Sequence, residues 1–233
     1  MHYYAHIAQD GRKQTVMEHM QGTAKRAGAC LADIGLGQSA YLAGLMHDLG
    51  KFTAAFQTYL KEGDRSKRGS VIHTFQGCRY LLEQIPNTAD QDSVIRAYTA
   101  ELLAFAVGAH HGLFDCVDET GRIGMQYRRE KENTFYREAV AGFFTQGITQ
   151  EEINEFFVQA SEEINRVIQR IENTYEKDDE YCFEIGLLAR MLLSAVIEGD
   201  RHNTAVFMKQ AMPPVYDEDM RPIWKNRLHF MEE

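Results

Sequence analysis

The apolar residues of this chain recur at helical spacing almost throughout, and this periodicity constrains the fold more than any other feature. The clearest stripe follows Thr149 and Glu152, whose T-x-x-E spacing is that of a helix capping box, and it comprises Ile153, Phe156, Phe157, Ala160, Ile164, Val167, Ile168 and Ile171. Runs of strict alternation, which would indicate strands, are scarce. Only 4 prolines interrupt the 233 residues, and two of them are adjacent. The pattern therefore predicts an all-α fold.

The same periodicity predicts where the helices lie. They are expected over residues 15–33, 38–49, 71–84, 93–109, 149–175 and 181–208. The last one is apolar enough in its first half to be buried almost completely. Residues 114–129 are rich in glycine and charge and predict an irregular loop. The break at Pro213-Pro214 predicts that one domain covers residues 1–211 and that residues 212–233 form a tail or a linker.

Composition excludes several classes of protein. Hydrophobic residues make up 44% and charged residues 25% of the chain, as in soluble globular proteins, and no stretch approaches the roughly 18 apolar residues of a membrane span. The four cysteines (Cys30, Cys78, Cys116 and Cys182) are scattered without a CxxC pair, which favours buried, reduced thiols and a cytoplasmic protein. A net charge of -9 argues against a broad surface for duplex DNA. A polyanionic substrate would therefore need a local source of attraction.

The segment LMHDLGKF has the clearest chemical meaning. His47 and Asp48 lie side by side at the predicted end of an apolar helix, and Lys51 follows one turn later. On a helix, all three side chains could face one cavity. The imidazole can bind a metal, the carboxylate can bridge two metals, and the ammonium can hold a phosphate oxygen. The structural alternative is a hydrogen-bonded helix end at which Lys51 is a solvated partner of the helix dipole.

Other histidines strengthen the metal-binding interpretation. His19 and His73 lie among apolar neighbours within predicted helices, and His110-His111 closes the apolar run LLAFAVGA. Two adjacent imidazoles would be costly to bury without partners. Asp200 lies near the end of an otherwise apolar helix. One histidine on an apolar face is usually an ordinary core residue, but five histidines and two aspartates in one helical domain predict a metal site.

The order of these residues, H…HD-x-x-K…H…HH…D, resembles the HD nuclease domain of the CRISPR-associated helicase–nuclease of type I interference systems. The segments GLMHDLGKF and AHHG carry most of the resemblance, which spans about residues 5–204. It implies an HD-domain helical bundle that holds two metal ions with Asp48 between them. The first ion would be bound by His19, His47, Asp48 and Asp200, and the second by Asp48, His73, His110 and His111.

The chain departs from the family pattern before its last aspartate. An alanine usually precedes that aspartate, whereas Glu198-Gly199 precedes Asp200 here, so Glu198 is an alternative ligand. We expect Asp200 to be the ligand because Arg201 and Thr204, which are typical of the motif, follow it.

The resemblance implies a metal-dependent phosphodiesterase, an endonuclease that cleaves single-stranded DNA in CRISPR interference and antiviral defence. Asp48 and Lys51 would be catalytic, and Lys51 would also bind the substrate phosphate. Mixed imidazole and carboxylate ligands suit manganese, iron, cobalt or nickel better than magnesium. Two divalent ions would also make the site locally cationic. Basic residues could add to this attraction or could be solvated loop charges: Arg65, Lys67, Arg68, Arg128, Arg129 and Lys131.

Two other classes compete with a nuclease. One is an HD phosphohydrolase acting on a small deoxynucleotide or cyclic nucleotide, and the other is a non-catalytic helical binding module. The module is disfavoured because every expected ligand position holds a competent ligand. The resemblance also implies a helicase domain or subunit and a CRISPR surveillance complex as partners. The sequence contains no GxxxxGK[ST] loop, so residues 212–233 are expected to lead toward a helicase domain that is absent here.

Overall fold

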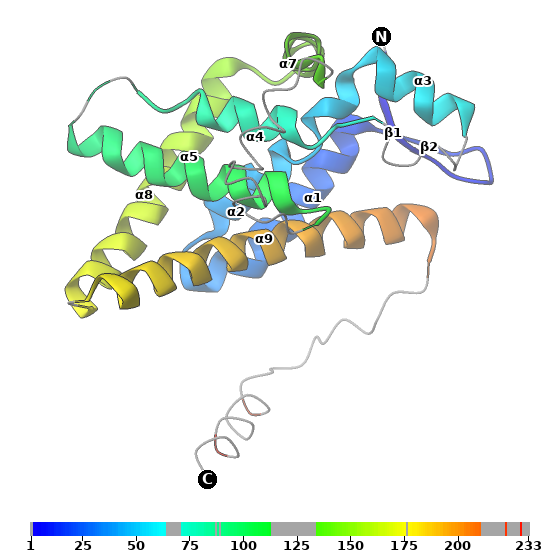
Figure 1. Ribbon diagram of the computed structural model, residues 1–233. Coiled ribbons are helices and arrows are strands. Elements are labelled where there is room, and N and C mark those ends of the chain that lie inside the picture. Colours follow the sequence, from blue (N-terminus) through cyan, green and yellow to red (C-terminus); the bar gives the residue numbers. More distant parts are fainter. Residues whose placement is uncertain are drawn as a thin grey trace, which may run out of the picture.

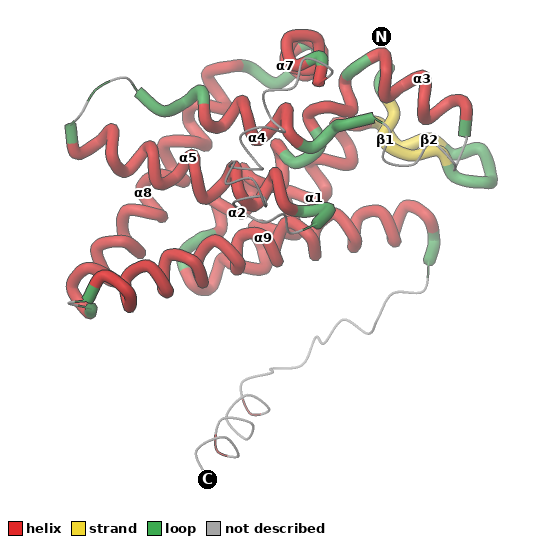
Figure 2. The backbone as a smooth tube through the Cα atoms, in the orientation of Figure 1, coloured by secondary structure: helices red, strands yellow, loops and turns green. Residues whose placement is uncertain are grey.

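The computed structural model describes residues 2–63, 71–86, 88, 90–112, 134–175, 177–210, 222 and 229 (Figure 1). Its helices are α1 (Val16–Leu31), α2 (Gly37–Met46), α3 (Ala54–Glu62), α4 (Phe75–Leu82), α5 (Gln91–Ala109), α7 (Tyr136–Phe144), α8 (Gln150–Thr174) and α9 (Asp178–Met208). Two short 3-10 helices, η1 (Ala32–Ile34) and η2 (Leu49–Phe52), follow α1 and α2. The fold is all-α, as predicted, with one small two-stranded sheet beside it (Figure 2).

Helix α2 is the centre of the bundle. Its sequence, GQSAYLAGLM, is apolar on almost every side, and its buried residues are Ser39, Ala40, Leu42, Ala43, Gly44, Leu45 and Met46. A helix of this kind must be covered on all its faces. Helices α1, α5, α8 and α9 all pack against it. The residues directly after α2 in the sequence therefore lie near the centre of the bundle.

Helix α9 runs along one side of the whole bundle (Figure 1). It packs against α1, α5 and α2. Small buried residues of α1, among them Ala24 and Ala27, allow the helices to approach closely. This packing brings the second half of α9 next to the first turns of α1.

The start of α8 forms the predicted capping box. The Thr149 hydroxyl accepts from the Glu152 N–H, and the Glu152 carboxylate accepts from the Thr149 N–H. Farther along α8, the buried carboxylate of Glu163 accepts from the N–H groups of Gln38 (3.0 Å) and Ser39 (2.8 Å). It thereby satisfies two of the free donors at the start of α2. A side chain from a distant helix thus caps the helix that leads into the HD segment.

Three features near the N-terminal half differ from the predictions. Strand β1 (Tyr4–Ile7) pairs antiparallel with β2 (Lys13–Thr15), where no strands were predicted because both are short. Helix α2 ends at Met46 instead of residue 49. The helix predicted over residues 71–84 begins only at Phe75, so His73 precedes it.

The first half of α9 is buried on one face only, so the prediction that it is buried almost completely was wrong. Phe183 is 69% exposed and Leu187 is 44% exposed. An apolar segment is buried only where neighbouring helices pack against it, and they cover only one face of the first half of α9. The thiols also differ from expectation, since Cys78 is buried but Cys30 and Cys182 are exposed. Among the helices of the described ranges, none has the length and apolar character needed to cross a bilayer.

Some predictions fall outside the described residues. The expected loop over residues 114–129 and all six basic residues proposed to attract a polyanion lie within residues 64–70 and 113–133. Cys116 and all but two positions of the expected tail, residues 212–233, also lie there or in other residues that are not described.

Candidate metal centre

The end of α2 places the HD segment in the core. The Nδ1–H of His47 donates to the carbonyl of Gly44 over 2.7 Å, and Asp48 follows, before η2. Both side chains are buried. His47 Nε2 lies 3.0 Å from Asp48 Oδ2, and Lys51 Nζ lies 2.6 Å from the same oxygen. The three side chains therefore converge, although through a turn and a 3-10 helix instead of one continuous helix.

His73 reaches the site because the chain passes very close to Gly50. The Gly50 N–H donates to the carbonyl of His73 over 3.0 Å. A Cβ atom at Gly50 would lie 2.4 Å from His73 Cα, so only glycine fits. The His73 Nδ1–H donates to the carbonyl of Val71 over 3.0 Å, and His73 Nε2 lies 3.8 Å from Asp48 Oδ1. This backbone pairing with η2 explains why His73 is not in a helix.

His110 and His111 follow the last turn of α5. The buried His110 donates from Nδ1 to the carbonyl of Val107 over 2.7 Å, and its Nε2 lies 3.8 Å from Asp48 Oδ1. His111 is exposed, and its Nε2 lies 3.1 Å from His73 Nε2. The end of α5 thus places both imidazoles beside the HD segment.

Helices α1 and α9 complete the site. His19 Nε2 lies 3.2 Å from Asp48 Oδ2 and 3.2 Å from Asp200 Oδ1. Glu198, the alternative ligand, instead pairs with Arg26 over 2.8 Å. Of the two carboxylates at this point of α9, Asp200 is the one that lies in the site.

The predicted ligands gather into two groups that share Asp48. The inner group consists of His19, His47, Asp48 and Asp200, whose ligand atoms all lie within 4.8 Å of one another. The outer group consists of Asp48, His73 and His111 by the same criterion. His110, which was expected with the outer group, has its Nε2 3.8 Å from Asp48 Oδ1 and also meets the same criterion with His111 and Asp200. It lies between the two groups, beside Asp48.

The hydrogen bonds of the histidines test whether a metal fits the inner group. A carbonyl oxygen only accepts, so His47 Nδ1 must carry the ring proton. His19 Nδ1 likewise faces the side-chain oxygen of Asn203 at 2.9 Å. Neutral rings in these tautomers have a lone pair on Nε2, yet His19 Nε2 and His47 Nε2 lie 3.2 Å apart. Neighbouring ligands about 2.1 Å from one metal would lie roughly 3.0 to 3.4 Å apart, in octahedral and tetrahedral geometry respectively. A cation between the rings fits this geometry.

Two buried atoms without hydrogen-bond partners in the described part of the chain indicate a cation site on the other side of Asp48 as well. Asp48 Oδ1 and His110 Nε2 are buried and have no hydrogen-bond partner among the described residues. Both are acceptors, because the proton of His110 is on Nδ1. Leaving two acceptors buried and unpaired is costly, and a shared cation would satisfy both.

The carboxylates of the site are held in their charged form. Burial opposes ionisation of Asp48, but His47 and Lys51 outweigh burial and hold its pKa well below the usual range. Burial also opposes ionisation of Asp200, but the neighbouring His19, whose Nε2 lies 3.2 Å from Oδ1, and His47 outweigh burial and lower its pKa. Ionised carboxylates are the form that binds metals.

The histidines divide into two kinds. Burial lowers the pKa of His73 to about 4 and that of His110 to about 3. The His111 residue is exposed, but partial desolvation of its ring by the neighbouring side chains lowers its pKa as well. Burial and Lys51 oppose protonation of His19 too, but hydrogen bonds to the two carboxylates outweigh them and raise its pKa. The outer rings are therefore neutral and ready to bind a metal, whereas a proton competes for His19.

Lys51 is not the solvated residue that the structural alternative requires. Its side chain is buried, contacts Asp48 and lies with Nζ 5.5 Å from the centre of the Phe56 ring. An ammonium without water must be balanced by a nearby negative charge, and Asp48 supplies it. Any anion that enters the site would meet this ammonium.

Sequence reasoning missed several residues around the centre. Asn203 and Gln14 form a hydrogen-bonded pair beside His19. His6 packs edge-on against the His19 ring at 4.7 Å, with its Nε2 3.3 Å from the Thr204 hydroxyl, and burial lowers the pKa of His6 to about 3. The spacing of Asp200 and Asn203, three residues apart on one helix face, was the available signal for Asn203.

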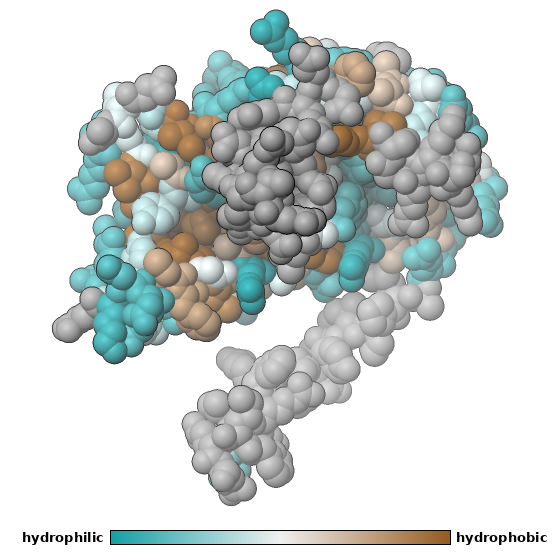
Figure 3. Space-filling model, in the orientation of Figure 1, coloured by the Kyte–Doolittle hydropathy of each residue, from teal (hydrophilic) through white to brown (hydrophobic). Residues whose placement is uncertain are grey.

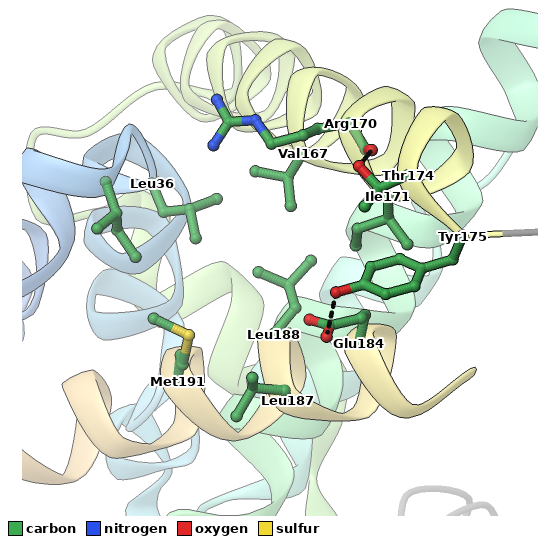
Figure 4. A pocket seen from close by; sticks show the side chains of 11 residues that line it. Leu36, Val167, Arg170, Ile171, Thr174, Tyr175, Glu184, Leu187, Leu188 and Met191 are labelled. Atoms are coloured by element: carbon green, nitrogen blue, oxygen red, sulfur yellow. Dashed lines mark hydrogen bonds between the residues drawn. The ribbon is translucent and has the colours of Figure 1, made fainter. Parts of the chain in front are cut away.

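A separate apolar cleft lies between α8 and α9 (Figure 4). It has a volume of about 330 Å³, and the Tyr175 hydroxyl donates to Glu184 over 3.0 Å at its edge. Leu188 in this cleft precedes Asp200 by about 18 Å along the helix axis, so the cleft is not part of the metal centre. Apolar side chains also lie over α5 and part of α9 on the face shown in Figure 3.

One family of known proteins matches this chain. The sequence profile of the family described as "Cas3, HD domain" matches residues 8–196. The match includes the HD segment and the histidines up to His111, and it ends before Asp200. A comparison with curated proteins found no match.

Proposed function

Since the chain belongs to the Cas3 HD-domain family, we propose that it is an endonuclease that cuts single-stranded DNA with two metal ions. The family membership itself makes the chain a metal-dependent nuclease or phosphohydrolase of the CRISPR interference machinery. The proposal concerns the substrate, the number of ions and the residues that act.

The position of Asp48 between the two groups carries the proposal. Its Oδ2 faces His19 and His47 at 3.2 and 3.0 Å, whereas its Oδ1 faces His73 and His110 at 3.8 Å each. One carboxylate thus offers an oxygen to each of two sets of histidines. Two ions held in this way would activate a water molecule and stabilise the charge on a phosphodiester.

Lys51 has the chemistry of a phosphate-binding residue. Its ammonium is held at Asp48 by the ion pair and is too strongly cationic to be a metal ligand itself. A phosphate oxygen beside Asp48 would come within reach of Nζ. We therefore assign Lys51 to binding and orienting the scissile phosphate.

The exposure of the ligands indicates the side from which DNA enters. His19 and His47 are fully buried, whereas His111 is exposed and the His73 side chain is 20% exposed. The Asp200 side chain is also 19% exposed, so a phosphate would approach over the outer group and the Asp200 side of the inner group. A single strand can bend one phosphate into such a site, whereas a duplex is stiff and bulky. In this proposal, a helicase partner and a CRISPR surveillance complex provide the single strand.

A substrate panel tests the proposal. Protein loaded with Mn²⁺ is incubated with circular single-stranded DNA, closed circular duplex of the same sequence, and a set of deoxynucleotides and cyclic nucleotides. We expect cleavage of the single-stranded circle and little cleavage of the duplex. Asp200→Ala should be inactive, and Glu198→Ala should keep its activity because Glu198 pairs with Arg26 outside the site.

Two results would contradict the proposal. If the protein cut closed duplex and single-stranded DNA at equal rates, the site would not select single strands by limiting the access of a stiff duplex. Hydrolysis of a free nucleotide without any cleavage of DNA would make the chain a small-nucleotide phosphohydrolase.

A further inference from the structure

The histidines of the centre are held by two different kinds of hydrogen bond. His47 and His110 each donate from Nδ1 to the carbonyl three residues earlier, and His73 donates to the carbonyl two residues earlier. At a helix C-terminus the last carbonyls have no partner within the helix. His47 and His110 follow such helix ends, so their own segments provide the acceptor.

His19 has no such local acceptor. It lies in the first turns of α1, where the backbone carbonyls are used by the helix itself. Its Nδ1 instead lies 2.9 Å from Oδ1 of Asn203, which is 184 residues away on α9. His19 therefore depends on tertiary structure for the orientation of its ring.

The amide of Asn203 is held by two further elements. Gln14 on β2, which is buried, donates from Nε2 to Asn203 Oδ1 over 2.8 Å. Gly22, one turn after His19 on α1, leaves the room that the amide fills. A Cβ atom at Gly22 would lie 1.9 Å from Asn203 Nδ2 and 2.8 Å from its Cγ.

We propose that Asn203 is a positioning residue for the metal centre. It keeps the proton of His19 on Nδ1 and thereby directs the lone pair of Nε2 toward Asp48 and Asp200. Without this acceptor, the proton could move to Nε2, where both carboxylates lie 3.2 Å away. A protonated Nε2 cannot bind a metal. The inference rests on the proposed role of His19 as a ligand, but not on the identity of the substrate.

Calorimetric titration with Mn²⁺ tests the role of the side chain. Asn203→Leu should weaken binding by about 10- to 100-fold, as the loss of a partner of a metal-bound histidine typically does. Asn203→Asp should retain the wild-type affinity because a carboxylate also accepts from Nδ1–H. Asn165→Leu, the same change on α8, should have no effect on the affinity.

Gly22→Ala provides a second variant with the opposite structural effect. Alanine favours a helix more than glycine does, and the three atoms nearest to the added methyl group all belong to the side-chain amide of Asn203. We expect a melting temperature in chelator equal to or above that of the wild type, together with weaker Mn²⁺ binding. If Asn203 only stabilised the fold, Gly22→Ala would not weaken Mn²⁺ binding while leaving the melting temperature unchanged or higher.

Proton NMR of the Zn²⁺-loaded protein observes the hydrogen bond directly. The Nδ1–H resonance of His19, assigned by its loss in His19→Gln, should be present in the wild type and in Asn203→Asp and absent in Asn203→Leu. If Asn203→Leu and Gly22→Ala both bound Mn²⁺ with wild-type affinity, this inference would be overturned and the proposed function would stand. Failure of the wild type to bind Mn²⁺ at all would overturn the proposed function together with the inference.

Discussion

The inner and outer groups share Asp48 but differ in how their other members are held. The inner ligands come from α1, from the end of α2 and from α9, and His19 and His47 are fully buried. The outer ligands, His73 and His111, lie outside regular helices and are partly or largely exposed. We expect the inner group to be the more rigid of the two, because His19, His47 and Asp48 are buried among packed helices.

The two groups also differ in charge. The inner group contains two carboxylates, Asp48 and Asp200, whereas the outer group contains only the shared Asp48. More negative charge and a preorganised geometry both favour tight binding of a cation. We infer that an inner ion would bind more tightly, and that an outer ion would be the one closer to the substrate.

The largest effect is expected from Asp48→Ala, since its carboxylate belongs to both groups. Metal analysis should show fewer ions at both positions. Cleavage should fall by about three orders of magnitude or more, because metal ions supply several kcal/mol of transition-state stabilisation. Cleavage of single-stranded DNA by Asp48→Ala at a rate near that of the wild type would refute the assignment of the HD segment.

Removing one histidine from each group separates the two positions. His19→Ala and His73→Ala should each keep about one ion per chain, and each should weaken the affected ion by more than the roughly 10- to 100-fold typical of a lost supporting residue. His19→Ala should remove the tighter ion, as measured by calorimetry with Mn²⁺. Loss of the same ion in both variants would mean that the centre holds a single ion.

Lys51→Ala should affect catalysis without emptying either position. A hydrogen bond to a charged group contributes about 1.5–3 kcal/mol, so cleavage should slow by roughly 10- to 100-fold. Metal content should remain at the wild-type value or rise, because the ammonium no longer competes for Asp48. If Lys51→Ala lost metal as completely as Asp48→Ala, Lys51 would be part of the ligand structure and not a phosphate-binding residue.

The smallest effect concerns acid stability of the metal-free protein. The pKa of His73 is lowered from 6.5 to about 4 and that of His110 to about 3. The unfolded chain therefore binds more protons between these values and 6.5, and the free energy of unfolding should fall as pH decreases through this window. The pKa of His19 is raised, so its contribution has the opposite sign and is lost as pH rises.

Urea unfolding in chelator at pH 8, 6 and 5 measures this difference. His73→Gln should lose less stability on acidification than the wild type, and His19→Gln should lose more. Identical pH profiles for the two variants would show that the inner and outer rings do not differ in this way.

Much of this fold could be predicted from local patterns. The stripe after Thr149 predicted α8 and its capping box, because both depend only on residues within a few turns. The spacing of His47, Asp48 and Lys51 also predicted that these side chains would face one another. His73 was wrongly placed in a helix, because its conformation depends on the backbone of Gly50, which the helical periodicity around His73 does not reveal.

The sequence by itself determined the helical class, the apolar helix before His47 and the residues able to bind metal, since periodicity and side-chain chemistry are local properties. His47 and His110 even find their Nδ1 acceptors within their own segments. The sequence left Glu198 as an alternative to Asp200. Only the tertiary structure brought Asp200 to Nε2 of His19 and Asn203 to its Nδ1, with Glu198 paired elsewhere. Those contacts join α1 to α9, and they exist only because burial of apolar surface packs the two helices together.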